Sequence, residues 1–300
     1  AAVTGYYPEY GEYAQKAILR WSFCDVIDRC GSLYSGAQTA EGVQLVQEGR
    51  LGYEEYAALG FGAWSFDTTQ ASSWEPFELV TLYGIDLPRD ARDARTTGTY
   101  APVVSYPHWL AGLEFNWDRL GDRRSGDARH SDRSWAELAE KLYAVQEARW
   151  ARERVLTART DHPVSGPPYF VFDSIHAAGY PWNTISDQGE SRADLALVSS
   201  RAAFGMWALF KSDYSDLLLK SVCTLNDPDR GWFEGRLERS GGHERAISCT
   251  TNALVLQALL YKTRGKLFEP PAQPTLLEVR TGDIWRRPGR CFPAERLRCS

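Results

Sequence analysis

The chain has 300 residues, of which 43% are hydrophobic and 24% charged, and its formal net charge is −5. This composition is typical of a globular protein and excludes a disordered chain. The acidic balance argues against a nucleic-acid-binding protein, and no apolar run approaches the roughly 18 residues that a membrane span needs.

Apolar residues recur at steps of three and four along much of the chain, which is the spacing of an amphipathic helix. The clearest stretch covers residues 134–159, where Trp135, Leu138 and Leu142 lie on one apolar stripe. The same spacing predicts helices at residues 10–26, 53–66, 109–120, 195–210, 214–225 and 249–262. A short strand candidate lies at residues 169–172, but no alternating pattern is sustained. We therefore expect an all-α fold.

The connections between these helices are long and rich in aromatic residues. The longest, residues 160–192, contains Tyr169 and Trp182 and is too aromatic to be disordered. Loops of this length in a compact domain are usually functional. The composition then changes near the C-terminus, where prolines end the helical region and arginines outnumber acidic residues. We predict a helical domain at residues 1–269 and an extension at residues 270–300 that packs on it.

The number of cysteines indicates the cellular compartment in which the protein is found. There are six of them: Cys24, Cys30, Cys223, Cys249, Cys291 and Cys299. The sequence does not choose among their disulfide connectivities, although the first two and the last two are close in sequence. An even number is typical of an oxidising compartment, whereas six free thiols in a cytosolic protein are the alternative. The start at Ala-Ala-Val-Thr, without Met, also favours an exported protein. We expect a periplasmic or secreted protein with disulfides, and no metal site because no CxxC pair occurs.

Two helix starts carry acidic and aromatic residues together. Tyr53 and Glu54 follow a glycine-rich turn, where a carboxylate in the first helical turn is either a capping charge or part of a cavity. Trp232 and Glu234 lie between glycines, shortly before the helix that contains Asn252, which is either a cap or a ligand-binding amide.

The longest connection holds a further group of polar and aromatic side chains. Asp173, His176, Trp182 and Asn183 lie within one irregular segment. They could supply the proton transfer, stacking and amide hydrogen bonds of a polar-ligand pocket. The alternative is that they simply pack the loop.

The sequence lacks the motifs of several other enzyme classes. The chain has no nucleophile elbow, P-loop or dinucleotide fingerprint, so serine hydrolase and NTPase hypotheses have no support. Acidic residues near aromatic helix ends remain, which is typical of two-carboxylate sugar chemistry. We expect no cofactor.

Six stretches together resemble a known family. They include EGRLGYEEYAALGF and YFVFDSIHAAGYPWNTIS and lie at residues 48–61, 103–115, 143–160, 169–186, 199–209 and 231–261. In order and spacing they resemble the bacterial DUF3131 family, which is linked to exopolysaccharide and periplasmic glucan metabolism and is related to glucoamylase-like proteins. The resemblance implies an (α/α)6 toroid with long aromatic-rich loops at one mouth. It also matches Glu54 and Glu114 to recurrent family glutamates.

Three places depart from the family pattern. A Ser-Tyr-Pro-His stretch ends at His108 where relatives commonly have Ser-Glu-Pro-Tyr. Arg-Thr-Asp ends at Asp161 where they often have Ser-Glu-Asp, and Gln257 stands where glutamate is frequent. Each change removes a carboxylate, which favours a binding protein over an enzyme.

The leading hypothesis is a glycoside hydrolase-like enzyme that cleaves a bacterial polysaccharide, either a β-glucan or an exopolysaccharide. We expect Glu54 to be the acid, with its pKa raised by aromatic neighbours, and Asp173 to be its partner. The remaining predicted site residues bind the substrate by stacking or hydrogen bonding: Tyr53, Glu114, His176, Trp182, Asn183, Trp232, Glu234 and Asn252.

Two alternatives stay open. The first is a non-catalytic polysaccharide-binding protein of an export or assembly system, which would keep the aromatic residues but not the acid pair. The second is a polysaccharide lyase, for which Tyr180, His176 and Asn183 could supply the catalytic groups. In every case the expected partner is a polysaccharide or oligosaccharide.

Overall fold

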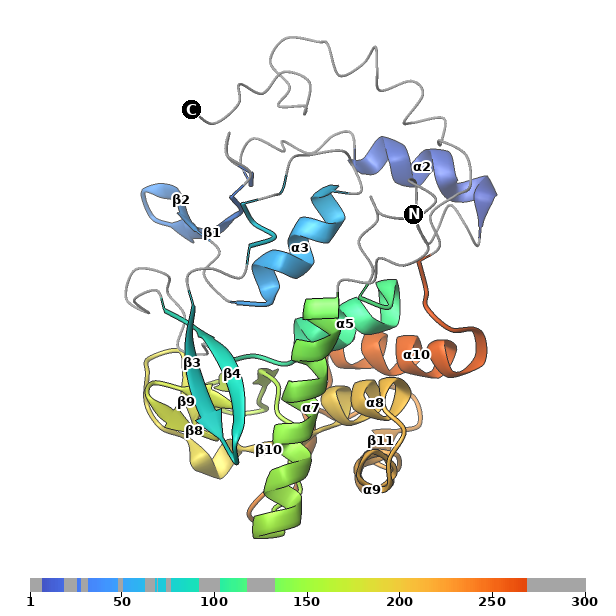
Figure 1. The fold of residues 1–300 in the computed structure, drawn as a ribbon. Helices are drawn as coiled ribbons and strands as arrows, with labels where there is room; N and C mark the ends of the chain where they lie inside the picture. Colours follow the sequence, from blue (N-terminus) through green and yellow to red (C-terminus); the bar gives the residue numbers. More distant parts are fainter. Residues whose placement is uncertain are drawn as a thin grey trace.

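The computed structural model describes residues 7–18, 26–27, 32–47, 51–62, 68, 70–73, 77–91, 103–117 and 133–268. These residues form seven α-helices, one short 3-10 helix and fourteen short strands in six small antiparallel sheets (Figure 1). No described helix is long and apolar enough to cross a membrane.

Each described α-helix overlaps one of the stretches of helical spacing, although several begin or end at other residues than predicted. Their bounds are α2 Pro8–Ile18, α3 Tyr53–Gly62, α5 Tyr106–Phe115, α7 Arg133–Glu153, α8 Ser200–Leu209, α9 Asp213–Val222 and α10 Cys249–Arg264, with the 3-10 helix η2 at Ala193–Leu195. Serine side chains cap three of them, because a serine oxygen accepts a hydrogen bond from an otherwise unpaired amide of the first turn. These caps are Ser199 for α8, Ser212 for α9 and Ser248 for α10.

The core forms where α5, α7, α8, α9 and α10 meet. Trp109 of α5 and Leu254 of α10 are fully buried there. Gly205 lets α8 approach them closely, since a Cβ at this position would lie 3.1 Å from Cβ of Trp109. Figure 1 shows α8, α9 and α10 on one side of α7 and the β3–β4 hairpin on the other.

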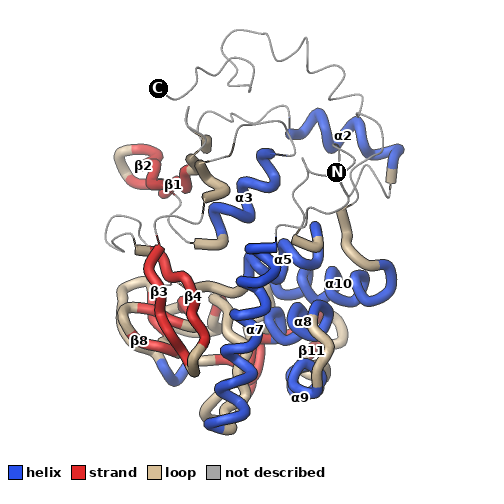
Figure 2. Tube along the Cα trace, in the orientation of Figure 1, coloured by secondary structure: helices blue, strands red, loops and turns tan. Residues whose placement is uncertain are grey.

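The strands occupy the connections between the helices, coloured red in Figure 2. Two hairpins precede α5: β1 Tyr34–Thr39 with β2 Gly42–Gln47, and β3 Phe77–Leu82 with β4 Ile85–Asp90. Between α7 and α8, β5 His162–Pro163, β6 Phe170–Asp173 and β9 Thr184–Ser186 form one sheet, and β7 His176–Ala177 pairs with β8 Tyr180–Pro181. Around α8 to α10, β10 Leu197–Ser199, β13 Gly235–Leu237 and β14 His243–Glu244 form another sheet, and β11 Asn226–Asp227 pairs with β12 Gly231–Trp232.

The predicted all-α toroid is therefore wrong, and the fold is mixed α/β. An (α/α)6 toroid needs six helix pairs, whereas the described residues contain seven α-helices and many strands. Strands of two or three residues are too short to show the alternation that identifies a strand in sequence. The β3–β4 hairpin turns at Tyr83 and Gly84, both with positive φ, and Tyr at the first of these positions is not a usual hairpin signal. The predicted extension at residues 270–300 lies outside the described residues.

Candidate functional site

Glu114, near the end of α5, joins three helices that are far apart in sequence. Its Oε2 accepts a hydrogen bond of 2.7 Å from the hydroxyl of Tyr56 in α3, and its Oε1 accepts one of 2.8 Å from Nε2 of Gln257 in α10. Burial raises the pKa of the Glu114 carboxyl, while the two hydrogen bonds oppose the rise. Among the glutamates that the family resemblance singled out, this one has an environment that favours the protonated acid.

Two further tyrosines lie at this junction. The rings of Tyr53 and Tyr106 have centroids 6.3 Å apart, and Tyr106 begins α5. Burial raises the pKa of the Tyr106 phenol, the charge of Arg201 opposes the rise, and smaller effects come from Glu114 and then Cys249. These interactions place Tyr106 near both Glu114 and the first turns of α8 and α10. We call Tyr53, Tyr56, Tyr106 and Glu114 the Glu114 cluster.

Arg201 of α8 lies against this cluster. Its guanidinium carbon is 4.3 Å from the centroid of the Tyr106 ring, which is a cation–π distance. The sequence analysis did not select Arg201 or Tyr106. The available signal was one charged residue in an otherwise small and apolar helix, Ser-Arg-Ala-Ala-Phe-Gly-Met-Trp.

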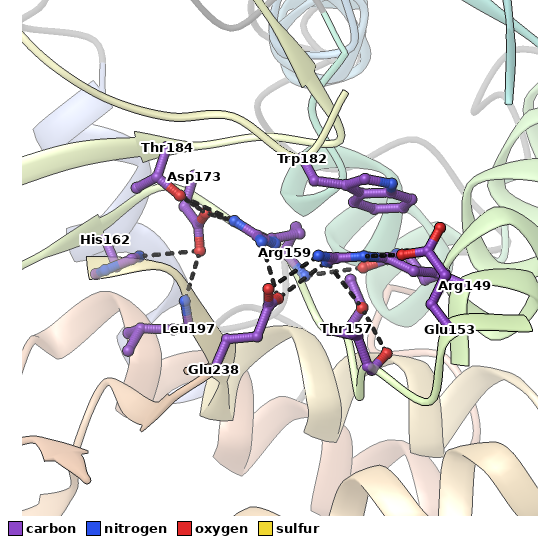
Figure 3. Close-up of polar contacts among 12 residues, drawn as sticks. Arg149, Glu153, Thr157, Arg159, His162, Asp173, Trp182, Thr184, Leu197 and Glu238 are labelled. Carbon is purple, nitrogen blue, oxygen red and sulfur yellow. Dashed lines mark hydrogen bonds and ion pairs between the residues drawn. The ribbon is translucent and has the colours of Figure 1, made fainter. Parts of the chain in front are cut away.

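Asp173, the predicted catalytic partner, is fully buried in a polar network (Figure 3). Its Oδ1 is ion-paired with Arg159 and accepts a hydrogen bond of 2.7 Å from the hydroxyl of Thr184. Its Oδ2 accepts a hydrogen bond of 2.9 Å from the backbone amide of Leu197, and Nδ1 of His162 is 3.9 Å away. Both oxygens therefore hold β6, β9 and β10 together.

Glu238 extends this network to α7. It accepts hydrogen bonds of 2.8 Å from Arg159 and of 2.9 and 3.0 Å from Arg149. The guanidinium of Arg149 in turn lies 4.7 Å from the ring centroid of Trp182. Figure 3 shows Arg159 between the carboxylates of Asp173 and Glu238. Two arginines and two carboxylates thus balance their charges inside the protein.

Glu54, the predicted acid, is also buried. Its Oε1 accepts a hydrogen bond of 3.2 Å from the backbone amide of Leu33, which precedes β1. The neighbouring Glu55 accepts a hydrogen bond from the amide of Gly52, just before α3. The described contacts of Glu54 and Asp173 therefore involve separate parts of the fold, and none of them joins the two carboxylates.

The predicted residues around α10 organise the start of that helix. Both oxygens of the fully buried Glu234 accept hydrogen bonds, from the hydroxyls of Ser248 and Thr251. Asn252 accepts a hydrogen bond of 2.8 Å from the amide of Trp232 and donates one of 3.1 Å to its carbonyl. These contacts fix the β12 turn against α10.

The predicted site residues of the longest connection each contact different parts of the fold. His176 is buried, and burial, followed by the charge of Arg89, lowers its pKa. Trp182 donates a hydrogen bond of 3.1 Å to the hydroxyl of Tyr83, and Asn183 donates one of 3.3 Å to a carbonyl of β7. Tyr180, the lyase candidate, is 68% exposed.

Two of the six cysteines lie in the described residues. Cys223 and Cys249 are free and exposed thiols, so the described residues contain no disulfide between them. The other four cysteines lie outside the described residues. In the part of the chain that the structure describes, no three metal-ligating side chains gather.

The fold and these contacts define a mixed α/β protein with a partly buried carboxyl and three tyrosines at the junction of α3, α5 and α10. The chain belongs to the DUF3131 family, described as a protein of unknown function, whose model matches residues 1–265. Comparison with curated proteins and with solved structures gives no match to the chain.

Proposed function

We propose that the protein is a polysaccharide-binding protein whose binding site is the Glu114 cluster. The observation that carries the proposal is the hydrogen bond of Tyr56 to the partly buried carboxyl of Glu114, with Tyr106 near that carboxyl and Tyr53 beside Tyr106. Tyrosine rings stack on the apolar faces of sugars, and carboxyl and hydroxyl groups bind sugar hydroxyls.

Binding is favoured over two-carboxylate hydrolysis by the contacts of the predicted acid pair. Both oxygens of Asp173 hold strands and Arg159 in place, and Glu54 binds the backbone before β1. A retaining or inverting glycosidase needs two carboxyl groups on either side of one glycosidic bond. The described contacts supply one such group in the cluster, Glu114.

Hydrolysis remains the second candidate because of one observation. Burial raises the pKa of Glu114, as a general acid requires. If the protein is a hydrolase, we propose Glu114 rather than Glu54 as its acid.

The test measures binding and cleavage together. Calorimetric titration with β-glucan and exopolysaccharide oligosaccharides gives the affinity, and an assay of reducing ends detects cleavage. We expect Tyr53→Ala to weaken binding about fivefold to tenfold, since one ring contact contributes about 1 kcal/mol. Tyr169→Ala removes a tyrosine that is 66% exposed outside the cluster and should leave the affinity unchanged.

Each outcome decides between the candidates. Binding by the wild type without new reducing ends supports the binding protein. New reducing ends that disappear in Glu114→Gln establish the hydrolase instead. If no glycan of the panel binds, or if Tyr169→Ala and Tyr53→Ala weaken binding equally, the proposed site is wrong.

We also propose a periplasmic or secreted location, because an exopolysaccharide or a periplasmic glucan lies outside the cytoplasm. Fractionation of cells that produce the protein tests it, and recovery in the cytoplasmic fraction would contradict it.

A further inference from the structure

Arg201 is a buried cation that lacks an ionic partner among the described residues. Its side chain is on α8, the residue is 5% exposed, and its Nε has no hydrogen-bond partner. No carboxylate of the described residues lies within ion-pair distance of its guanidinium. The two other buried arginines differ, because Arg149 and Arg159 both pair with Glu238.

Burying a charge without an ionic partner destabilises the folded protein. The guanidinium of Arg201 also lies near helix starts, where the backbone amides produce a positive electrostatic potential. Arg201 is the second residue of α8, and its neighbour Tyr106 is the first residue of α5. Cys249, whose electrostatic effect reaches Tyr106, is the first residue of α10. Helix N-termini carry partial positive charge, so they disfavour a cation and attract an anion. The ring of Tyr106 offsets only part of the cost of burying the guanidinium.

The nearby carboxyl group does not neutralise this charge. Glu114 affects Tyr106 electrostatically, but both its oxygens accept hydrogen bonds from other side chains, Tyr56 and Gln257. The site therefore combines a buried cation and the starts of α5 and α8 with tyrosine rings, whereas the start of α10 already holds the carboxylate of Glu234. It has the charge that an anionic ligand needs and an aromatic surface that suits a sugar.

We propose that the ligand is an acidic glycan, in which the carboxylate of a uronic acid residue pairs with Arg201. The planar guanidinium matches a carboxylate with two parallel hydrogen bonds. A uronic acid joins that carboxylate to an apolar ring face in one residue, which suits a site where the Arg201 guanidinium lies over one face of the Tyr106 ring. This inference rests on the proposed polysaccharide binding and names the class of polysaccharide.

The test compares glycans that differ only in charge. Oligosaccharides of galacturonate, glucuronate and mannuronate are titrated into the wild-type protein, each beside its methyl ester. We expect the acid to bind about tenfold to one-hundredfold more tightly than its ester, as for hydrogen bonds between charged groups. We expect Arg201→Gln to bind the acid and its ester with equal affinity. The control Arg192→Gln removes an exposed arginine paired with Asp194 and should keep the preference.

The outcomes separate this inference from the proposed function. The acidic-glycan proposal is overturned if the wild type binds acids and their esters with equal affinity, or if it binds neutral glucans but no acidic glycan. Either result leaves the proposal of polysaccharide binding intact. Absence of all glycan binding overturns both. If Arg201→Gln does not fold, the comparison of acid with ester in the wild type decides alone. An unchanged preference in a folded Arg201→Gln protein also refutes the role of Arg201.

Discussion

Replacing Asp173 by Asn should destabilise the protein rather than remove a catalytic group. Asp173 and Glu238 balance the buried charges of Arg149 and Arg159, so the substitution leaves one excess positive charge inside the protein. The new amide also places a donor where Arg159 or the amide of Leu197 now donates. Breaking a buried ion pair on one side costs about 3–5 kcal/mol of unfolding free energy.

Calorimetric melting measures this effect. At about 2 °C per kcal/mol for a chain of this size, the Tm of Asp173→Asn should fall by about 6–10 °C. The matched control is Asp194→Asn, because Asp194 forms an exposed pair with Arg192, and its loss should hardly change the Tm. Glycan binding by Asp173→Asn, measured well below its Tm, should match the wild type. A variant that melts like the wild type but loses glycan binding or cleavage would refute the structural role.

Three further predictions concern protonation, backbone and thiols. Burial lowers the pKa of His108 to about 3, so between about pH 6.5 and 3 the unfolded chain takes up a proton at this residue and the folded protein does not. His108 should therefore contribute a loss of about 1.4 kcal/mol of unfolding free energy per pH unit on acidification, and His108→Gln should show a loss that is shallower by this amount in urea titrations. Gly231→Ala should cost about 2 kcal/mol, because φ is +102° and a Cβ would lie 2.2 Å from a side-chain oxygen of α10. Gly166→Ala meets open space and should melt like the wild type; equal losses would contradict the reasoning. Alkylation of the unreduced native protein should label both Cys223 and Cys249, and a disulfide-linked peptide joining them would contradict their assignment as free thiols.

The helices could be predicted because their apolar stripes extend over several turns. Trp135, Leu138 and Leu142 are buried on one face of α7, as their spacing indicates. The strands could not be predicted, because a strand such as His162–Pro163 or His176–Ala177 consists of two residues and depends on partners elsewhere in the chain. The positions of the helices were therefore predicted approximately, but the predicted all-α toroid was wrong.

The site could be predicted only where one residue carried a signal of its own. Glu114 followed from the family resemblance, and the structure surrounds it with tyrosines. Arg201 and Tyr106 lie far apart in sequence, and nothing local to either residue indicates that their side chains meet. Asp173 was predicted as the partner of the catalytic acid, and nothing in its sequence surroundings indicates that its carboxylate lies in a buried ion pair with Arg159.

The position of Glu238 has a consequence for how the chain is made. Arg149 and Arg159 precede it by 89 and 79 residues, so both emerge from the ribosome well before their shared partner. Until Glu238 arrives, the guanidinium of Arg159 has Asp173 as its partner, and that of Arg149 has the exposed Glu153 at the end of α7. Water must therefore keep solvating these charges during synthesis, and this part of the fold can close only when the last third of the protein is present. A chain cut before residue 238 should consequently fail to form the β-rich region around Asp173, even though β5, β6 and β9 are all present in the fragment.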